Sequence, residues 1–345
     1  MLNALKRIIP SLAAVGLIVN PAKSELLNID CNTSDFEAAV SSIHGVLDGA
    51  LVTDRDDLVI LGSPILQRAI ETDLKSKTET LEKLTNRLRT IDAHPALFLL
   101  RNCFAIPKLL FGLRSAPCFR SSEDLLELDS IIRSCTEDIC NVPFDETGWR
   151  QATLPISLGG LGLRCPSDVA LPAYCSSVHA NRSLVEEILT NSLESPLDNS
   201  IVTVGSEWRA QGLDYPTDPK KQKSWDSVRS RKAANSLKLE CDQHRLACFS
   251  AAAQPHSGAW LSAIPSPAIG TLMDDECVRY AVALRTGARV CEQHRCRCGA
   301  VIDEFGLHPL ACSKSAGRFP RHSALNDILK RALDAAGFHS ILEPV

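Results

Sequence analysis

Four residues near the end of the sequence have the types and the spacing of a metal site. Thiolate and imidazole are the ligands that Zn²⁺ prefers, and structural zinc sites are almost always tetrahedral with four such groups. Two of the cysteines are one residue apart and precede Gly299, which permits a tight turn, whereas the histidine and the last cysteine are spaced to share one face of a helical turn. A closed set of protein ligands predicts a structural zinc ion rather than a catalytic one. The predicted ligands are Cys296, Cys298, His308 and Cys312.

Two neighbouring residues leave the ligand set open. Cys291 and His294 lie just upstream and could replace one of the four ligands. We prefer Cys296 because the Cys296-Arg-Cys298-Gly299 turn is tight. The alternative to a metal site is a set of ordinary cysteines with a surface histidine.

Two basic segments could neutralise phosphates, although the whole chain has a formal net charge of −4. Residues 219–238 carry seven Lys and Arg against Asp226 alone, and residues 285–331 carry nine against four Asp and Glu. The alternative is a solvated charged face, which is the weaker interpretation for the second segment because that segment surrounds the predicted zinc site. The residues predicted to bind nucleic acid, either RNA or DNA, are Lys220, Lys221, Lys223, Arg229, Arg231, Lys232, Arg295 and Arg297.

The composition predicts a reduced, intracellular protein that is mainly α-helical. Aromatic residues make up 5% of the chain, so aliphatic side chains must build the core. Ten of the fourteen cysteines are scattered singly, as at Cys103, Cys135 and Cys175, and we expect them to be buried small hydrophobic residues in a reduced compartment. The apolar run 8–19 imitates a signal peptide but has a poor cleavage pattern, so we expect a nuclear or cytoplasmic protein that is not secreted. No other stretch approaches the ~20 apolar residues of a membrane span, so no membrane partner is expected. Glycine-rich phosphate loops and nucleophile elbows are absent, so no small-molecule substrate is identified.

The periodicity predicts a mainly α fold (α+β) with a small strand-containing part at its start. We expect a helix at 3–16, a strand at 26–29, a helix at 34–47 with Ser34 or Thr33 as N-cap, and a buried strand at 58–62. A long amphipathic helix should follow residue 64. Further helices are predicted at 96–114, 122–140, 167–191, 223–254, 273–287 and 321–336. The segment 193–222 is rich in Ser, Asn, Asp and Pro and is interpreted as a linker.

The order of several motifs resembles the polyprotein of non-LTR retrotransposons, in the region that follows the reverse-transcriptase active site. Gly16-Leu-Ile-Val-Asn-Pro-Ala-Lys23-Ser-Glu25 resembles motif D of these enzymes, and Leu61-Gly62-Ser63-Pro64 resembles motif E, the primer grip. Stretches at 96–101, 107–110, 149–155 and 159–162 resemble the thumb and the linker that follows it. Cys298, His308 and Cys312 resemble the knuckle that precedes a restriction-like endonuclease in some of these elements.

The resemblance implies four parts. These are a palm remnant with motifs D and E at 1–63, a helical thumb and connector at 64–192, a linker at 193–222, and a helical region at 223–345 with a zinc knuckle at 296–312. It also implies one catalytic role, that of Lys23 as general acid near the leaving pyrophosphate.

The resemblance also implies where the Mg²⁺-binding carboxylates of the parent RNA-directed DNA polymerase and of the endonuclease would lie, and none of them falls within this sequence. The Mg²⁺ ions of the polymerase are held by an aspartate pair upstream of motif D, and the endonuclease carboxylates would follow the knuckle at a distance that places them after Val345. Asp56-Asp57 imitates the pair but follows motif D, so we interpret it as a turn. We therefore expect a fragment that binds nucleic acid without polymerase or nuclease activity. The alternative is a non-catalytic zinc-containing nucleic-acid-binding or scaffold protein.

Overall fold

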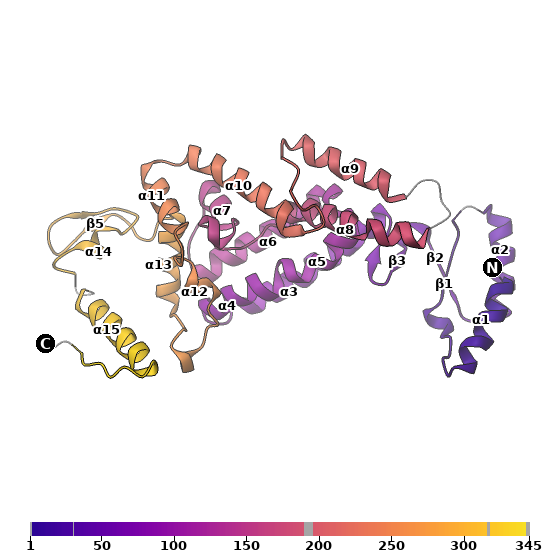
Figure 1. Cartoon of the computed structure of the whole chain (residues 1–345), viewed down its shortest axis with the longest axis horizontal. Coiled ribbons are helices and arrows are strands. Elements are labelled where there is room, and N and C mark those ends of the chain that lie inside the picture. The colour runs from indigo at the N-terminus through magenta and orange to yellow at the C-terminus, as the bar shows by residue number, and fades with distance from the viewer. Residues whose placement is uncertain (1, 30, 190–195, 316–317, 343–345) are drawn as a thin grey trace. The chain divides into compact units, whose positions relative to one another are not determined.

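Helices dominate the structure and strands are few and short, which confirms the fold class predicted from the sequence. The computed structural model describes residues 2–29, 31–189, 196–315 and 318–342, and its elements are labelled in Figure 1. The chain divides into two compact units, each made of segments that are not contiguous in the sequence. Unit 1 comprises Met1–Arg87, Leu100–Ile132 and Arg164–Lys232, and unit 2 comprises Leu88–Leu99, Arg133–Leu163 and Ala233–Val345. The four consecutive domains expected from the sequence stay a prediction.

The first part of unit 1 is a small α+β structure. Strands β1 (Glu25–Leu27) and β2 (Leu51–Thr53) pair in parallel and are connected by α2 (Thr33–His44), as parallel pairing requires. Helix α1 (Leu2–Ala14) packs on a core centred on Leu26 and Ile43. The N-cap of α2 is Asn32, whose side chain accepts a hydrogen bond from the backbone N–H of Asp35, so the expectation of Ser34 or Thr33 was wrong by one or two positions.

The strand expected to be buried at 58–62 is instead the exposed strand of a hairpin whose second strand is buried. Strand β3 (Val59–Ile60) pairs antiparallel with β4 (Ser63–Pro64) across a turn at Leu61 and Gly62, which both have positive φ. Val59 and Ile60 are 46% and 52% exposed, because β4 is their only strand partner in the described chain. An apolar run bounded by a turn signal thus predicted the strand but not its burial.

The rest of unit 1 is helical. Its buried side chains lie at helical spacing, for example Ile70 and Leu74 on α3, and Leu125 and Leu128 on α6. The helices that contribute to this unit are α3 (Gln67–Leu88), the π-helical turn Leu100–Phe104, α5 (Ile106–Ser115), α6 (Ser122–Cys140), α8 (Pro166–Ile188), α9 (Pro196–Ala210) and α10 (Gln222–Glu240).

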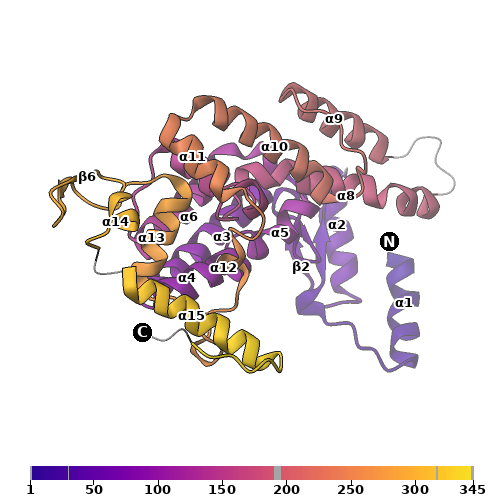
Figure 2. The same ribbon diagram turned by 60° about the vertical axis from the view of Figure 1, so that its left-hand side comes forward.

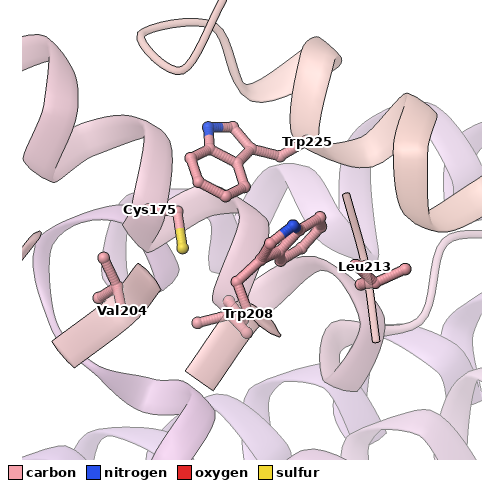
Figure 3. Close-up of a cluster of buried hydrophobic side chains, with 6 residues drawn as sticks. Cys175, Val204, Trp208, Leu213 and Trp225 are labelled. Carbon is pink, nitrogen blue, oxygen red and sulfur yellow. The ribbon is translucent and has the colours of Figure 1, made fainter. Parts of the chain in front are cut away.

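An aromatic pair stabilises the packing of α8, α9 and α10. The indole rings of Trp208 and Trp225 meet edge to face, with centroids 4.8 Å apart, and Cys175 lies beside them (Figure 3). Both indole N–H groups are satisfied, since Trp208 donates to the carbonyl of Asp214 and Trp225 donates to that of Pro219.

The segment 193–222 is therefore not the unstructured linker that its composition suggested. Residues 193–195 lie outside the described residues, but α9 occupies Pro196–Ala210 and buries Val204 and Trp208 in the core. Five of the ten Ser, Asn, Asp and Pro residues of this segment lie within the helix, four of them among its first five residues. Burial of one tryptophan outweighed a composition typical of loops.

Unit 2 contains the helices that position the predicted metal ligands. Helix α11 packs beside α13 (Figure 2), and Phe249 of α11 lies in a core with Leu154 and Leu237. The complete elements of this unit are α4 (Ala93–Leu99), α7 (Glu146–Ala152), α11 (Gln243–Ala252), α12 (Ala259–Ser262), α13 (Asp275–Thr286), β5 (His294–Arg295), β6 (Val301–Ile302), α14 (His308–Ala311) and α15 (Arg318–Ala335).

Two expectations drawn from hydrophobicity need correction. One described stretch, Ala93–Ser115, is long and apolar enough to cross a membrane by length and composition, although no such stretch was expected from the sequence. This is weak support for a membrane span, because core helices pass the same test, and Leu97 and Leu109 are buried.

Cys103 is exposed rather than buried, whereas Cys135 and Cys175 are buried as expected.

Candidate metal centre

The predicted zinc ligands lie on a β-hairpin and on the short helix that follows it. Strands β5 and β6 pair antiparallel, and the turn between them carries Cys296 and Cys298. This turn is closed by a hydrogen bond of 2.9 Å from the N–H of Gly299 to the carbonyl of Cys296. Gly299 has a φ of +93°, which an L side chain rarely adopts, so glycine permits the turn. Helix α14 then places His308 and Cys312 on one face.

The four side chains converge as a tetrahedral metal site requires. Their ligand atoms all lie within 4.8 Å of one another. Sγ of Cys296 and Sγ of Cys312 are 3.8 Å apart, and Sγ of Cys298 is 3.1 Å from Nε2 of His308. Zinc–ligand bonds of about 2.0–2.3 Å give tetrahedral edges of roughly 3.5–3.8 Å, so the observed spacing needs only small shifts. The residues form a metal-binding group compatible with zinc.

The electrostatics of the turn favour the anionic form of one thiol. Hydrogen bonds from the backbone N–H groups of Cys298 and Arg297 hold the pKa of the Cys296 thiol below its usual range. The N–H of Lys314 acts in the same direction on Cys312, but burial and the neighbouring thiols outweigh it and raise the pKa of Cys312. Without a cation, the second thiolate is therefore costly beside the first. A divalent cation reverses this cost, because it stabilises every thiolate that binds it.

The two competing residues are not part of the group. The thiol of Cys291 donates to the carbonyl of Asp303 at 3.2 Å, and Nδ1 of His294 lies 2.8 Å from the carbonyl of Glu292. Within the described residues, Cys296, Cys298, His308 and Cys312 are the set that converges on one point. The geometry thus favours the ligand set that the tight turn predicted.

The knuckle (residues 296–312) and the residues just before it are attached to α11 and α13 by contacts that the sequence did not suggest. The ring of Phe305, in the loop between β6 and α14, stacks on the ring of His244 of α11 with centroids 4.0 Å apart. Arg279 of α13 donates to the carbonyl of Val290 at 2.9 Å. A Cβ on Gly306 would lie 3.0 Å from Cγ2 of Val290, so this loop passes close to the residues just before the knuckle. The segment that carries the metal group is therefore held against α11 and α13.

Arg295 and Arg297, the predicted nucleic-acid ligands of the knuckle, are both exposed. Arg295 lies on β5, and Arg297 lies between the two cysteines of the turn. A cation bound to Cys296 and Cys298 would therefore also fix the backbone of Arg297, which lies between them. Lys314, which follows Cys312, is exposed as well and was not predicted from the sequence because it lies beyond the last ligand.

The basic segment 219–238 is partly structural. Arg229 pairs with Asp168 at 2.9 Å, and Nζ of Lys232 donates to the carbonyls of Gln211 and Gly212. Lys221 forms an exposed ion pair with Asp218. The remaining basic side chains of the predicted set are exposed, and no ion pair is found for them in the part of the chain that is described; they are Lys220, Lys223 and Arg231.

Lys23, the predicted general acid, is exposed at the end of the 3₁₀ turn Pro21–Lys23. Asn20 begins this turn by accepting a hydrogen bond of 3.0 Å from the N–H of Ala22. Lys23 belongs to unit 1 and the metal group belongs to unit 2. Its catalytic role stays a prediction.

No protein-family model matches the chain, and no curated protein matches it either.

Proposed function

We propose that this chain is a nucleic-acid-binding protein whose knuckle is ordered by a structural zinc ion. The observation that carries the proposal is the convergence of three thiols and one imidazole on the hairpin that exposes Arg295 and Arg297. Four protein ligands leave no open position for a substrate, so the metal acts on folding rather than on chemistry. Guanidinium groups on a rigid turn lose less conformational freedom when they bind phosphate.

The same proposal includes an origin in a non-LTR retrotransposon polyprotein, in the region that follows the reverse-transcriptase active site. It is supported by the order of the motifs at Lys23, at 61–64 and at the knuckle. Lys220, Lys223 and Arg231 would add phosphate contacts from unit 1, since their side chains are exposed. We assign the protein to a nuclear or cytoplasmic compartment, where its fourteen free cysteines stay reduced.

The experiment compares nucleic-acid binding by the full-length protein in three states: zinc-loaded, stripped with a chelator, and reloaded. Labelled single-stranded RNA, single-stranded DNA and duplex DNA are titrated at several salt concentrations. We expect binding that weakens with salt, is lost with the zinc and returns on reloading. Binding that is unchanged in the stripped protein, or absent in the loaded protein, would contradict the proposal.

A further inference from the structure

A small groove lies on the knuckle beside the metal group. It has a volume of about 230 Å³ and runs between the β5–β6 hairpin and the segment around α14. Its lining includes the side chains of Arg295, Arg297 and Lys314, which come from both sides of the metal group in the sequence. Cys296 also lines the groove, so the shape of the groove depends on how the metal ligands are arranged.

The charge of this groove is unbalanced. Two guanidinium groups and one ammonium group line it together with His294, and none of its described lining residues is acidic. Glu304, two residues after Ile302, is paired with Arg289 at 3.1 Å. Three cations around a small hollow produce a positive potential that attracts an anionic group.

The floor of the groove is apolar. Ile302 of β6 is 4% exposed and so offers little surface to a ligand, whereas Pro309, the second residue of α14, is half-buried. Sites for unpaired strands combine a basic groove that follows the phosphates with a side-chain surface on which a base lies, usually an aromatic ring. In this groove the ring of Pro309 takes the place of the aromatic ring. The volume lies below the roughly 300–1,000 Å³ of pockets for drug-sized ligands, so it suits one base or one sugar–phosphate unit.

We infer that this groove binds one nucleotide of an unpaired nucleic-acid strand. Arg295, Arg297 and Lys314 contact the phosphates, and the base lies against Pro309. A duplex keeps its bases stacked inside, so its phosphates reach the basic rim while its bases cannot reach the floor. This inference rests on the proposed nucleic-acid binding and adds to it a site, a new residue, Lys314, and a preference for single strands.

The test measures fluorescence anisotropy of zinc-loaded full-length protein with single-stranded DNA, single-stranded RNA and duplex DNA of equal length. Lys314→Gln and Arg297→Gln remove one charge each without removing a ligand, and zinc analysis verifies that each variant retains its metal. We expect tighter binding of both single strands than of duplex. Each substitution should weaken single-strand binding several-fold and reduce the salt dependence by about 0.7 ion per charge.

Two further variants separate charge from the apolar floor. Pro309→Ala keeps every cation and should reduce the preference for single strands over duplex. Lys83→Gln removes an exposed lysine of α3 and should change nothing. The groove is not the binding site if the wild type binds nucleic acid and Lys314→Gln and Arg297→Gln bind it equally tightly. The inferred preference for unpaired strands is wrong if duplex binds as tightly as single strands. In both cases the proposed function stands. If the zinc-loaded wild type binds none of the three probes, the proposed function itself is wrong.

Discussion

Sγ of Cys298 lies 3.1 Å from Nε2 of His308, although the two residues are ten positions apart in the sequence. The contact joins the hairpin turn to α14. A thiol is a weak donor, so this pair alone contributes little to stability. A cation that binds these two atoms, together with the thiolates of Cys296 and Cys312, would stabilise the short distance between them more strongly than the hydrogen bond does.

Serine substitutions at Cys298 and Cys291 distinguish a ligand from a neighbouring thiol. Cys298→Ser removes a thiolate from the converging group, so we expect most of the bound zinc to be lost and the melting temperature to fall. Cys291→Ser should retain about one zinc per chain, because the Cys291 thiol is hydrogen-bonded to the carbonyl of Asp303 and lies outside the group. Metal analysis of the purified proteins measures both. Equal zinc content in the two variants, whether full or absent, would show that the ligand set is misassigned.

The hairpin and α14 could be predicted from the sequence because ligand spacing constrains local geometry. Gly299 indicated a tight turn, and the interval from His308 to Cys312 indicated one helical turn, and both are present. The stacking of Phe305 on His244 could not be predicted, since it depends on how separate segments pack. Burial of the strand at 58–62, which contains β3, was predicted wrongly for a related reason, because an apolar run does not indicate whether another layer covers it.

Two helices were predicted accurately because their apolar spacing is long and regular, whereas the helices predicted at 96–114 and 223–254 are each divided. Helix α6 occupies Ser122–Cys140, where periodicity placed it, and α8 begins one residue before its predicted start. Helix α9 was missed because its first five residues, 196–200, have a composition typical of a loop, although Trp208 is fully buried. The sequence contains no local signal for the partner of Trp208, since Trp225 lies beyond the next turn and on another helix.

Phe305→Ala should loosen the knuckle without removing its metal. The substitution removes the ring that stacks on His244 but none of the four ligands. We expect the free energy of unfolding to fall by roughly 1–2 kcal/mol while the zinc content stays the same. Phe305→Tyr, which keeps the ring, serves as the control and should resemble the wild type. Chemical denaturation with metal analysis tests this, and zinc loss in Phe305→Ala alone would show that the stacking is needed for metal binding.

Asp129 makes the stability of unit 1 depend on pH. Burial raises its pKa to about 6, although it accepts hydrogen bonds from the hydroxyl and the backbone N–H of Ser167. A carboxyl group whose pKa is raised on folding stabilises the protein fully at low pH, and this stabilisation is lost as the pH rises through the folded value. Asp129→Asn imitates the protonated form, so its stability relative to the wild type should increase between pH 4 and pH 7.

The size of this effect follows from the pKa change. A rise from 3.8 to about 6 corresponds to at most about 3 kcal/mol at neutral pH. Denaturation of both proteins between pH 4 and pH 7 measures the difference between their free energies of unfolding. Groups that titrate in the same way in both proteins do not contribute to this difference. Glu127→Gln, at an exposed position of the same helix, is the control and should show a much smaller change. A stability difference that does not vary with pH would mean that Asp129 is ionised in the folded protein throughout.

Gly160 has no room for a side chain, and Ala substitution there should be among the most damaging changes in unit 2. A Cβ at this position would lie 2.0 Å from the carbonyl oxygen of Leu154 and 2.6 Å from that of Gln151, and both atoms belong to backbone. The loop cannot easily move away, because Nε of the buried Arg285 donates to the carbonyl of Gly160 at 2.9 Å and Nη2 donates to that of Ile156 at 2.8 Å. We expect Gly160→Ala to cost more than about 4 kcal/mol or to prevent accumulation of folded protein.

Gly205→Ala is the matched control for Gly160→Ala. Gly205 lies inside helix α9, and a Cβ there would make ordinary contact with the flexible end of Arg209 at 3.4 Å. Alanine loses less conformational entropy than glycine when a helix forms, so this variant should gain about 0.5–1 kcal/mol. Thermal and chemical denaturation of the two variants should therefore shift in opposite directions. A Gly160→Ala protein as stable as the wild type would mean that the loop around Gly160 is held less tightly than its contacts with Arg285 indicate.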